Sequence, residues 1–189
     1  PRGFSPSNET QGPAERVPGR VVVAGRLLGY KRVELVLRAW PIVAGQIPHA
    51  SLRIVGDGPE MAALILLADT DQNSESVCFL GQLPRREEVL AEMAAAELLL
   101  QPSTREGQST VVLEALTLGT PVLAAVGEET AVGDFLGDAT VTDLARLDVA
   151  ADAAAWGERI VRLLGDPAKR AELATAGARE VAELGWRDH

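Results

Sequence analysis

Short apolar runs alternate with amphipathic helical patterns along most of this 189-residue chain. From these runs we predict six strands, at Arg20–Gly25, Ser51–Gly56, Ser76–Leu80, Glu97–Gln101, Pro121–Ala125 and Thr140–Thr142. Strands that are apolar along their whole length need cover on both faces, and the helical segments between them can supply it. The pattern therefore predicts an α/β fold, in which helices lie on both faces of one parallel sheet.

The helical segments have recognisable starts and stops. We predict helices at Val33 to about Ala44, Glu60–Asp69, Arg86–Ala95, Ser109–Leu118, Asp148 to about Leu164, and Pro167 to about Leu184. Pro41 is expected to end or kink the first helix, because proline lacks an N–H and clashes with the preceding turn. Gly119 is expected to stop the fourth.

The first nineteen residues differ from the rest in composition. Pro1–Gly19 carries four prolines among polar residues and glycine, with hardly any apolar content, and cannot form a core strand or helix. We interpret residues 1–19 as a linker and residues 20–189 as a single domain. With 47% hydrophobic residues, this length supplies one substantial core.

Charge and composition exclude several classes of function. The formal net charge of −9 argues against a nucleic-acid partner, which needs a basic face to neutralise its phosphates. The single cysteine, Cys78, cannot form an internal disulfide; we expect it to be a small buried hydrophobe in a reducing compartment. We find no metal-ligand cluster, no apolar run of eighteen residues and no signal peptide in the sequence, so we expect a cytoplasmic protein.

The most informative stretch is Pro102–Gly119, in which a polar loop leads directly into a helix. Gly107 allows a tight turn, and Ser109 or Thr110 can cap the first N–H groups of the helix. The positive end of the helix dipole then favours a phosphate. Glu106, in the loop, and Glu114, about a turn and a half into the helix, can both face one small volume beside it.

A second loop is predicted at the same edge of the sheet. Ligands of parallel sheets bind beyond the carboxyl ends of the strands, where the loop Gly25–Lys31 also lies. Arg26 and Lys31 of this loop could clamp a diphosphate without a metal ion, with each contact worth on the order of 1.5–3 kcal/mol. Taken alone, these two residues are better interpreted as ordinary solvated cations, as most Arg and Lys residues in loops are.

Taken together, these segments resemble the nucleotide-binding half of the retaining, group-1-type glycosyltransferases, which have the GT-B fold. The resemblance rests on Gly25-Arg26-Leu27 with Lys31, Ile54–Pro59, Phe79–Gly81, Pro102-Ser103, Glu106-Gly107, Val112–Ala115 and Gly119–Val122. Order and spacing agree over most of the chain, and two glutamates with seven residues between them, Glu106 and Glu114, are typical of that family. The resemblance implies a Rossmann-like sheet that forms the C-terminal half of a GT-B enzyme.

The resemblance also implies roles for individual residues. Arg26 and Lys31 would bind the diphosphate of a nucleotide-sugar donor, Glu106 would hold sugar hydroxyls near the reacting carbon, and Glu114 would accept hydrogen bonds from the ribose. The remaining donor contacts would come from Gly25, Gly81, Gln82, Leu83, Gly107, Gln108, Ser109, Thr110 and Val111. Among these, Gly81–Leu83 would line the base pocket, and the backbone of Ser109–Val111 would cap the distal phosphate. No metal and no cofactor besides the donor is implied.

The sequence departs from the family pattern at three places. Gln108-Ser109 stands where a bulky residue followed by Gly or Pro is usual, Arg32 stands where a glycine commonly follows the lysine, and Val126–Ala131 only loosely resembles a paired-glycine loop. The family's acceptor site belongs to an N-terminal domain that these 189 residues do not contain. We therefore expect a donor-binding fragment that is inactive alone and whose partner is its own N-terminal domain; the sequence does not indicate the acceptor.

Two other functions are compatible with parts of the sequence. One is a module that binds a nucleotide sugar or another phosphorylated ligand without catalysis. The other is an NAD-binding domain, but Gly56–Met61 lacks the third glycine of that fingerprint. His49 and His189 are expected to be solvated, and Trp40, Trp156 and Trp186 to be packing anchors.

Overall fold

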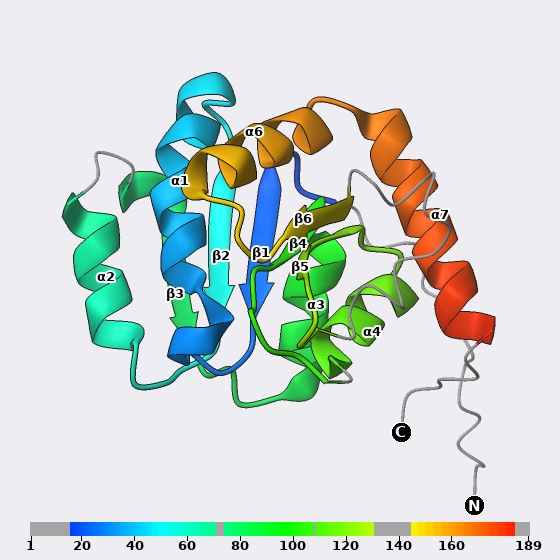
Figure 1. The fold of residues 1–189 in the computed structure, drawn as a ribbon, viewed down its shortest axis with the longest axis horizontal. Coiled ribbons are helices and arrows are strands. Elements are labelled where there is room, and N and C mark those ends of the chain that lie inside the picture. Colours follow the sequence, from blue (N-terminus) through cyan, green and yellow to red (C-terminus); the bar gives the residue numbers. More distant parts are fainter. Residues whose placement is uncertain (1–15, 71–73, 108, 131–144, 184–189) are drawn as a thin grey trace, which may run out of the picture.

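The computed structural model describes residues 16–70, 74–107, 109–130 and 145–183, and these form an α/β fold around one six-stranded parallel sheet (Figure 1). The strands lie in the order β3-β2-β1-β4-β5-β6. Their bounds are β1 Arg20–Ala24, β2 Ser51–Val55, β3 Val77–Gly81, β4 Leu98–Gln101, β5 Val122–Val126 and β6 Arg146–Asp148. Because the strand order reverses between β1 and β4, the loops that follow these two strands diverge and leave room for a ligand.

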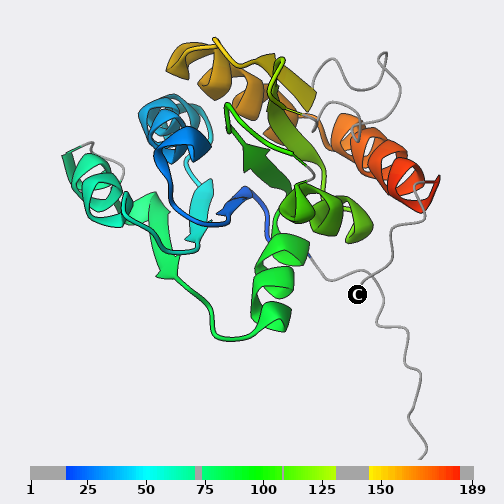
Figure 2. The same cartoon turned by 60° about the horizontal axis from the view of Figure 1, so that its bottom comes forward.

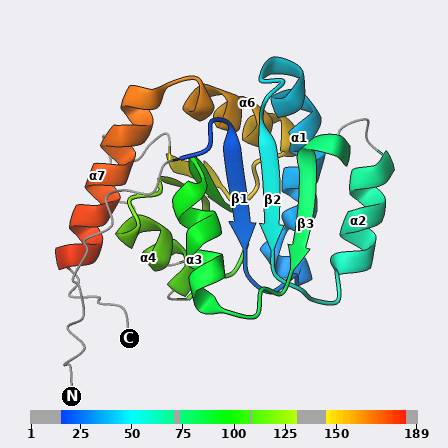
Figure 3. The ribbon, with the colours of Figure 1, turned by 180° about the vertical axis from the view of Figure 1, so that it is seen from behind.

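Helices cover both faces of the sheet, as the sequence predicts. They are α1 Val33–Gln46, α2 Met61–Thr70, α3 Arg86–Ala95, α4 Thr110–Thr117, α6 Ala153–Leu164 and α7 Pro167–Glu183, with short 3-10 turns at Gly29–Lys31 (η1) and Ser74–Ser76 (η2). Helices α1 and α6 pack against each other on one face, and α3 and α4 lie on the other, where α4 contacts α7 (Figures 1 and 3). No helix in the described ranges is long and apolar enough to cross a membrane.

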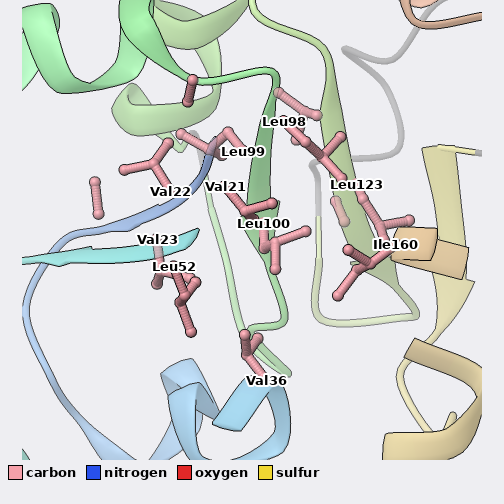
Figure 4. Close-up of a cluster of buried hydrophobic side chains, with 14 of the residues drawn as sticks. Val21, Val22, Val23, Val36, Leu52, Leu98, Leu99, Leu100, Leu123 and Ile160 are labelled. Carbon is pink, nitrogen blue, oxygen red and sulfur yellow. The ribbon is translucent and has the colours of Figure 1, made fainter. Parts of the chain in front are cut away.

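The core lies between the central strands and these helices (Figure 4). Val22 and Leu99 come from neighbouring strands, while Val36 of α1 and Ile160 of α6 close one side, and all four are fully buried. Trp40 and Trp156 are also 0% exposed, which confirms that they are packing anchors. His49 is exposed, as predicted.

Pro41 does not end the first helix, because α1 continues to Gln46. A proline inside a helix removes one hydrogen bond and costs about 3 kcal/mol. Ala39, Trp40 and Val43 are fully buried beside it. Burying such side chains outweighs the local cost, so packing sets the length of this helix.

The C-terminal third differs from the prediction in two places. The predicted strand Thr140–Thr142 lies outside the described residues, and the sixth strand of the sheet is β6. The predicted helix start at Asp148 is wrong, because α6 begins at Ala153. Asp152 caps it, and its carboxylate accepts a hydrogen bond from the backbone N–H of Ala155 at 2.9 Å.

Cys78 is half-buried, not buried, because it lies on β3 at the edge of the sheet. Trp186 and His189 lie outside the described residues.

Gly119 stops the fourth helix, as predicted, with a φ of 70° in the left-handed region.

The described part of the N-terminal segment lies against the domain. Arg16 donates hydrogen bonds to the carbonyl of Gly119 at 2.6 Å and to the hydroxyl of Thr120 at 3.0 Å. The backbone N–H of Gly19 donates to the Glu97 carboxylate at 2.8 Å. Burial lowers the pKa of the Arg16 guanidinium, and the nearby Glu97 charge opposes that shift. These contacts fix the direction in which the chain enters β1.

Candidate functional site

A pocket of about 740 Å³ lies at the carboxyl ends of the strands, the edge that Figure 2 turns toward the reader. Its lining comes from the loops after β1, β2 and β3 and consists of Gly25, Arg26, Gly56, Asp57, Gly58, Pro59 and Gln82. The size falls within the range of small-ligand sites. The pocket thus lies at the carboxyl edge of the sheet, on the β2 and β3 side of the reversal between β1 and β4.

The floor of this pocket is built from backbone groups in close contact. A Cβ at Gly56 would lie 1.9 Å from the carbonyl oxygen of Gly25, and one at Gly58 would lie 2.3 Å from the carbonyl oxygen of Leu27. Only glycine fits at these two positions. The Asp57 side chain accepts a hydrogen bond from the Gly58 N–H at 2.6 Å and so stabilises the turn.

The structure brings Lys31 and Glu106 together, although they are 75 residues apart in the sequence. The Lys31 ammonium forms an ion pair with Oε1 of Glu106, and both side chains are largely buried. The loops that carry them are also joined through the backbone, since the N–H of Thr104 donates to the carbonyl of Tyr30 at 2.9 Å. Arg26 is exposed and lines the pocket. The two predicted cations therefore share one edge of the sheet.

Gln101, the last residue of β4, also contacts Glu106, and the sequence analysis missed it. Its amide nitrogen donates to Oε1 of Glu106 and lies 3.1 Å from the Ser103 hydroxyl. The only sequence signal for this role is a polar residue at the end of an otherwise apolar buried strand.

Glu114 lies in a separate ion pair with Arg86, the first residue of α3. The Nη2 and Nε atoms of Arg86 lie 2.8 Å and 3.0 Å from Oε1 of Glu114, whose residue is 8% exposed. The two glutamates of the predicted site are thus held by different cations, Glu106 by Lys31 and Glu114 by Arg86. Arg86 was not predicted, because it comes from a different helix.

The N-terminus of α4 differs from the prediction in its capping. Ser109 is the N-cap residue, but its side chain makes no capping hydrogen bond, so this expectation is wrong. The Ser109 hydroxyl instead lies 3.5 Å from the Gln101 amide nitrogen. Thr110 is the first helical residue and cannot be the cap.

Glycine is not required by the backbone at position 107. The φ of Gly107 is outside the left-handed region, and an added Cβ would meet no described atom within 4 Å. The loop is instead shaped from the neighbouring segment, since the N–H of Glu106 donates to the carbonyl of Glu129 at 2.9 Å. Arg105 and Glu129 add an ion pair at 2.9 Å.

The other predicted donor contacts lie around the same edge. Gln82 is exposed and lines the pocket, whereas Leu83 and Val111 are half-buried against the core. Gly81 ends β3 with a φ of 66°. Gln108 lies outside the described residues. In the described ranges, no group of three or more His, Cys, Asp or Glu side chains is placed to hold a metal ion.

A family profile described as "Glycosyl transferases group 1" matches residues 9–180. The chain belongs to the group 1 glycosyltransferase family. One relative in this family is the GDP-mannose-dependent monoacylated alpha-(1-6)-phosphatidylinositol monomannoside mannosyltransferase of Corynebacterium glutamicum. It is 36% identical over 172 residues, which cover 85% of this chain and 42% of the relative.

Solved structures of glycosyltransferases share the fold. The pneumococcal O-GlcNAc transferase in complex with UDP and GlcNAc matches 89% of this chain with a TM-score of 0.78 and 19% identity, over 33% of its own length. The C-terminal domain of a group 1 protein from Francisella tularensis matches the same share with a TM-score of 0.76 and 16% identity, over 87% of its own length. The six-stranded sheet is therefore that of the Rossmann-like C-terminal domain of GT-B glycosyltransferases.

This group 1 chain spans only part of its curated relatives. It covers 29%, 42% and 41% of the length of three of them. The roles of Arg26, Lys31, Glu106 and Glu114 in a group 1 enzyme stay predictions.

Proposed function

We propose that this chain is the donor-binding part of a glycosyltransferase that transfers a sugar from a nucleoside diphosphate sugar to an acceptor hydroxyl. Transfer would proceed with retention of configuration and without a metal ion. Residues 20–189 would form the donor domain. Residues 1–19 would link it to an acceptor domain outside these 189 residues. A cytoplasmic location is part of the proposal and rests on the sequence alone.

The observation that carries this proposal is the placement of two cations at one edge of the sheet. Arg26 lines the 740 Å³ pocket, and Arg26 and Lys31, the partner of Glu106, together line a second, smaller pocket. During transfer, the bond between the sugar's anomeric carbon and the diphosphate would break, a bond to the acceptor oxygen would form, and the proton of the acceptor hydroxyl would pass to the departing diphosphate. Negative charge grows on the departing diphosphate, where Arg26, Lys31 and the N–H groups at the start of α4 would meet it.

Glu106 and Glu114 would then bind hydroxyls and would not act as an acid–base pair. The separate ion pairs of the two carboxylates support this assignment, since each carboxylate is paired with its own cation and not with the other carboxylate. The relatives include GDP-mannose-dependent mannosyltransferases, and one structural neighbour is a complex with UDP. The base and the sugar of this chain's donor are left to experiment.

A thermal-shift panel tests donor binding. UDP, GDP, ADP, dTDP and their sugar conjugates are compared with NAD. A ligand at about 100 times its dissociation constant adds about 2.7 kcal/mol to the free energy of unfolding and should raise the Tm by several degrees. If NAD raises the Tm and none of the nucleoside diphosphates or their sugar conjugates does, the proposal is overturned.

Metal independence has its own test. The longer protein that contains this chain is assayed for transfer before and after dialysis against EDTA, and the anomeric configuration of the product is determined by NMR. Unchanged turnover with a retained configuration is expected. Loss of turnover that Mg²⁺ restores, or an inverted product, contradicts that part of the proposal. Binding of the donor without any transfer would favour a non-catalytic module.

A further inference from the structure

Gln101 is a buried polar residue at the centre of the site. It is 3% exposed, and its amide nitrogen has three oxygen neighbours, on Glu106, Ser103 and Ser109. A buried amide is costly unless it is hydrogen-bonded, so these partners explain why a glutamine is tolerated at the end of an apolar strand. The hydroxyls of Ser103 and Ser109 place the amide, and the amide in turn contacts the carboxylate.

The carboxylate of Glu106 fixes which end of the amide faces it. An ionised carboxylate only accepts hydrogen bonds, so Gln101 has to present its nitrogen and not its oxygen. The same oxygen, Oε1, also accepts from Lys31. Among the described residues, both hydrogen bonds of this carboxylate go to Oε1, which leaves Oε2 for a ligand.

The two donors on Oε1 differ in how firmly they are held. Lys31 carries its charge on a flexible four-carbon chain, and a doubly charged diphosphate competes with Glu106 for it. Gln101 is neutral, buried, and carried by β4, which is hydrogen-bonded to β1 on one side and β5 on the other. When a diphosphate draws Lys31 away, Gln101 is the contact that remains.

Building on the proposed function, we infer that Gln101 is a positioning residue that holds Glu106 for recognition of the donor sugar. It keeps Oε1 bound so that Oε2 accepts a hydrogen bond from a sugar hydroxyl. Gln101 itself touches neither the sugar nor the diphosphate. Its loss therefore weakens the contribution of the sugar to binding and leaves that of the diphosphate.

The test uses calorimetry on all 189 residues to measure how much the sugar and the diphosphate each contribute to binding. Dissociation constants are determined for UDP, GDP, UDP-glucose and GDP-mannose, and the pair that binds is used. Gln101→Met removes the amide but keeps an unbranched side chain of similar length. The preference for the sugar conjugate over the free diphosphate is expected to fall about tenfold, because one hydrogen bond to a charged group is lost, with the free diphosphate changed less than about twofold.

A double-mutant cycle separates positioning from a general structural effect. In a Glu106→Gln background, Gln101→Met should cause no further loss of sugar preference, since its target is gone. Gln46→Met, at the exposed C-terminal end of α1, is the matched control and should bind like the wild type. If Gln101→Met is too unstable to measure, Gln101→Asn keeps an amide with a shorter reach and should show the same loss.

Three results overturn the inference: an unchanged sugar preference in Gln101→Met, equal losses for both ligands, or the same loss in the Glu106→Gln background. These outcomes leave the proposed function standing as long as the wild type binds the donor. If the wild type binds neither diphosphate nor conjugate, the proposed function fails and the role of Gln101 fails with it.

Discussion

At the scale of single residues, charge pairing across long sequence separations defines the site. Lys31 and Glu106 come from loops after β1 and β4, and Arg86 and Glu114 come from α3 and α4. Each carboxylate is buried enough that it needs its cation, and each cation lies next to the edge of the sheet where a diphosphate would bind. A ligand has to compete with or share these pairs.

The first prediction concerns Arg26 and Lys31. Replacing either by alanine should weaken binding of a nucleoside diphosphate by roughly 10-fold or more, because one charge-assisted contact is lost, and should change binding of the nucleoside much less. Calorimetry with both ligands measures the difference. Arg38→Ala, at an exposed position on α1, is the control and should leave both affinities unchanged. Equal losses for diphosphate and nucleoside would argue against the clamp.

The second prediction concerns Arg32, the non-glycine residue with a positive φ in the described ranges. Its φ is 51° and its ψ is 38°, a left-handed conformation that costs a residue with a Cβ about 1–2 kcal/mol. Its guanidinium donates to the carbonyl of Val149, which offsets part of that cost. Arg32→Gly and Arg32→Ala both lose this contact, but only glycine relieves the strain. Urea unfolding should find the glycine variant more stable than the alanine variant by about 1 kcal/mol; equal stabilities would mean that the backbone is not strained.

At the scale of elements, the sequence predicts five of the six strands of the sheet, the four central ones and β3 at one edge. Five of the predicted strands agree with β1–β5 to within about one residue at each end, because a buried parallel strand has to be apolar and its loops begin with glycine or polar residues. β6 was missed because Arg146-Leu-Asp148 is short and has one apolar residue. Its pairing with β5 is set by tertiary structure, not by its composition.

The residues of the candidate site also include some that the sequence predicts and some that it does not. Arg26, Lys31, Glu106 and Glu114 could be predicted because each lies in a local motif. Gln101 and Arg86 could not, because what marks them is a contact with a residue elsewhere in the fold. Packing likewise overrides local rules at Pro41.

The third prediction tests that override in α1. Pro41→Ala restores an N–H inside the helix and should stabilise the protein by about 1–3 kcal/mol, less the entropy that proline removes from the unfolded chain. Gly45→Ala in the same helix is the comparison; its side chain would meet nothing within 4 Å, and propensity alone should give about 1 kcal/mol. Urea midpoints measure both. A Pro41→Ala variant that is less stable than the wild type would mean that the proline ring itself fills the interface with the core.

At the scale of the whole molecule, the pocket is open at the carboxyl edge of the sheet, and residues 16–19 lie at the opposite ends of the strands. Arg16 and Gly19 are hydrogen-bonded to the segment between α3 and β4, and Arg16 also to the segment between α4 and β5. The proposed function places the acceptor site in a domain outside these 189 residues. Donor binding and transfer are then separable properties.

The fourth prediction follows from that separation. These 189 residues alone should bind the donor, but their transfer to an acceptor should be far below that of the longer protein, because donor and acceptor are not held together. Holding two reactants in place contributes up to about 7–11 kcal/mol to catalysis. Both proteins are assayed at equal donor saturation, so that a difference in turnover cannot come from a difference in affinity. Transfer by the 189 residues at the rate of the longer protein would show that the acceptor site lies within this domain, and the pocket at the carboxyl edge would then have to hold both substrates.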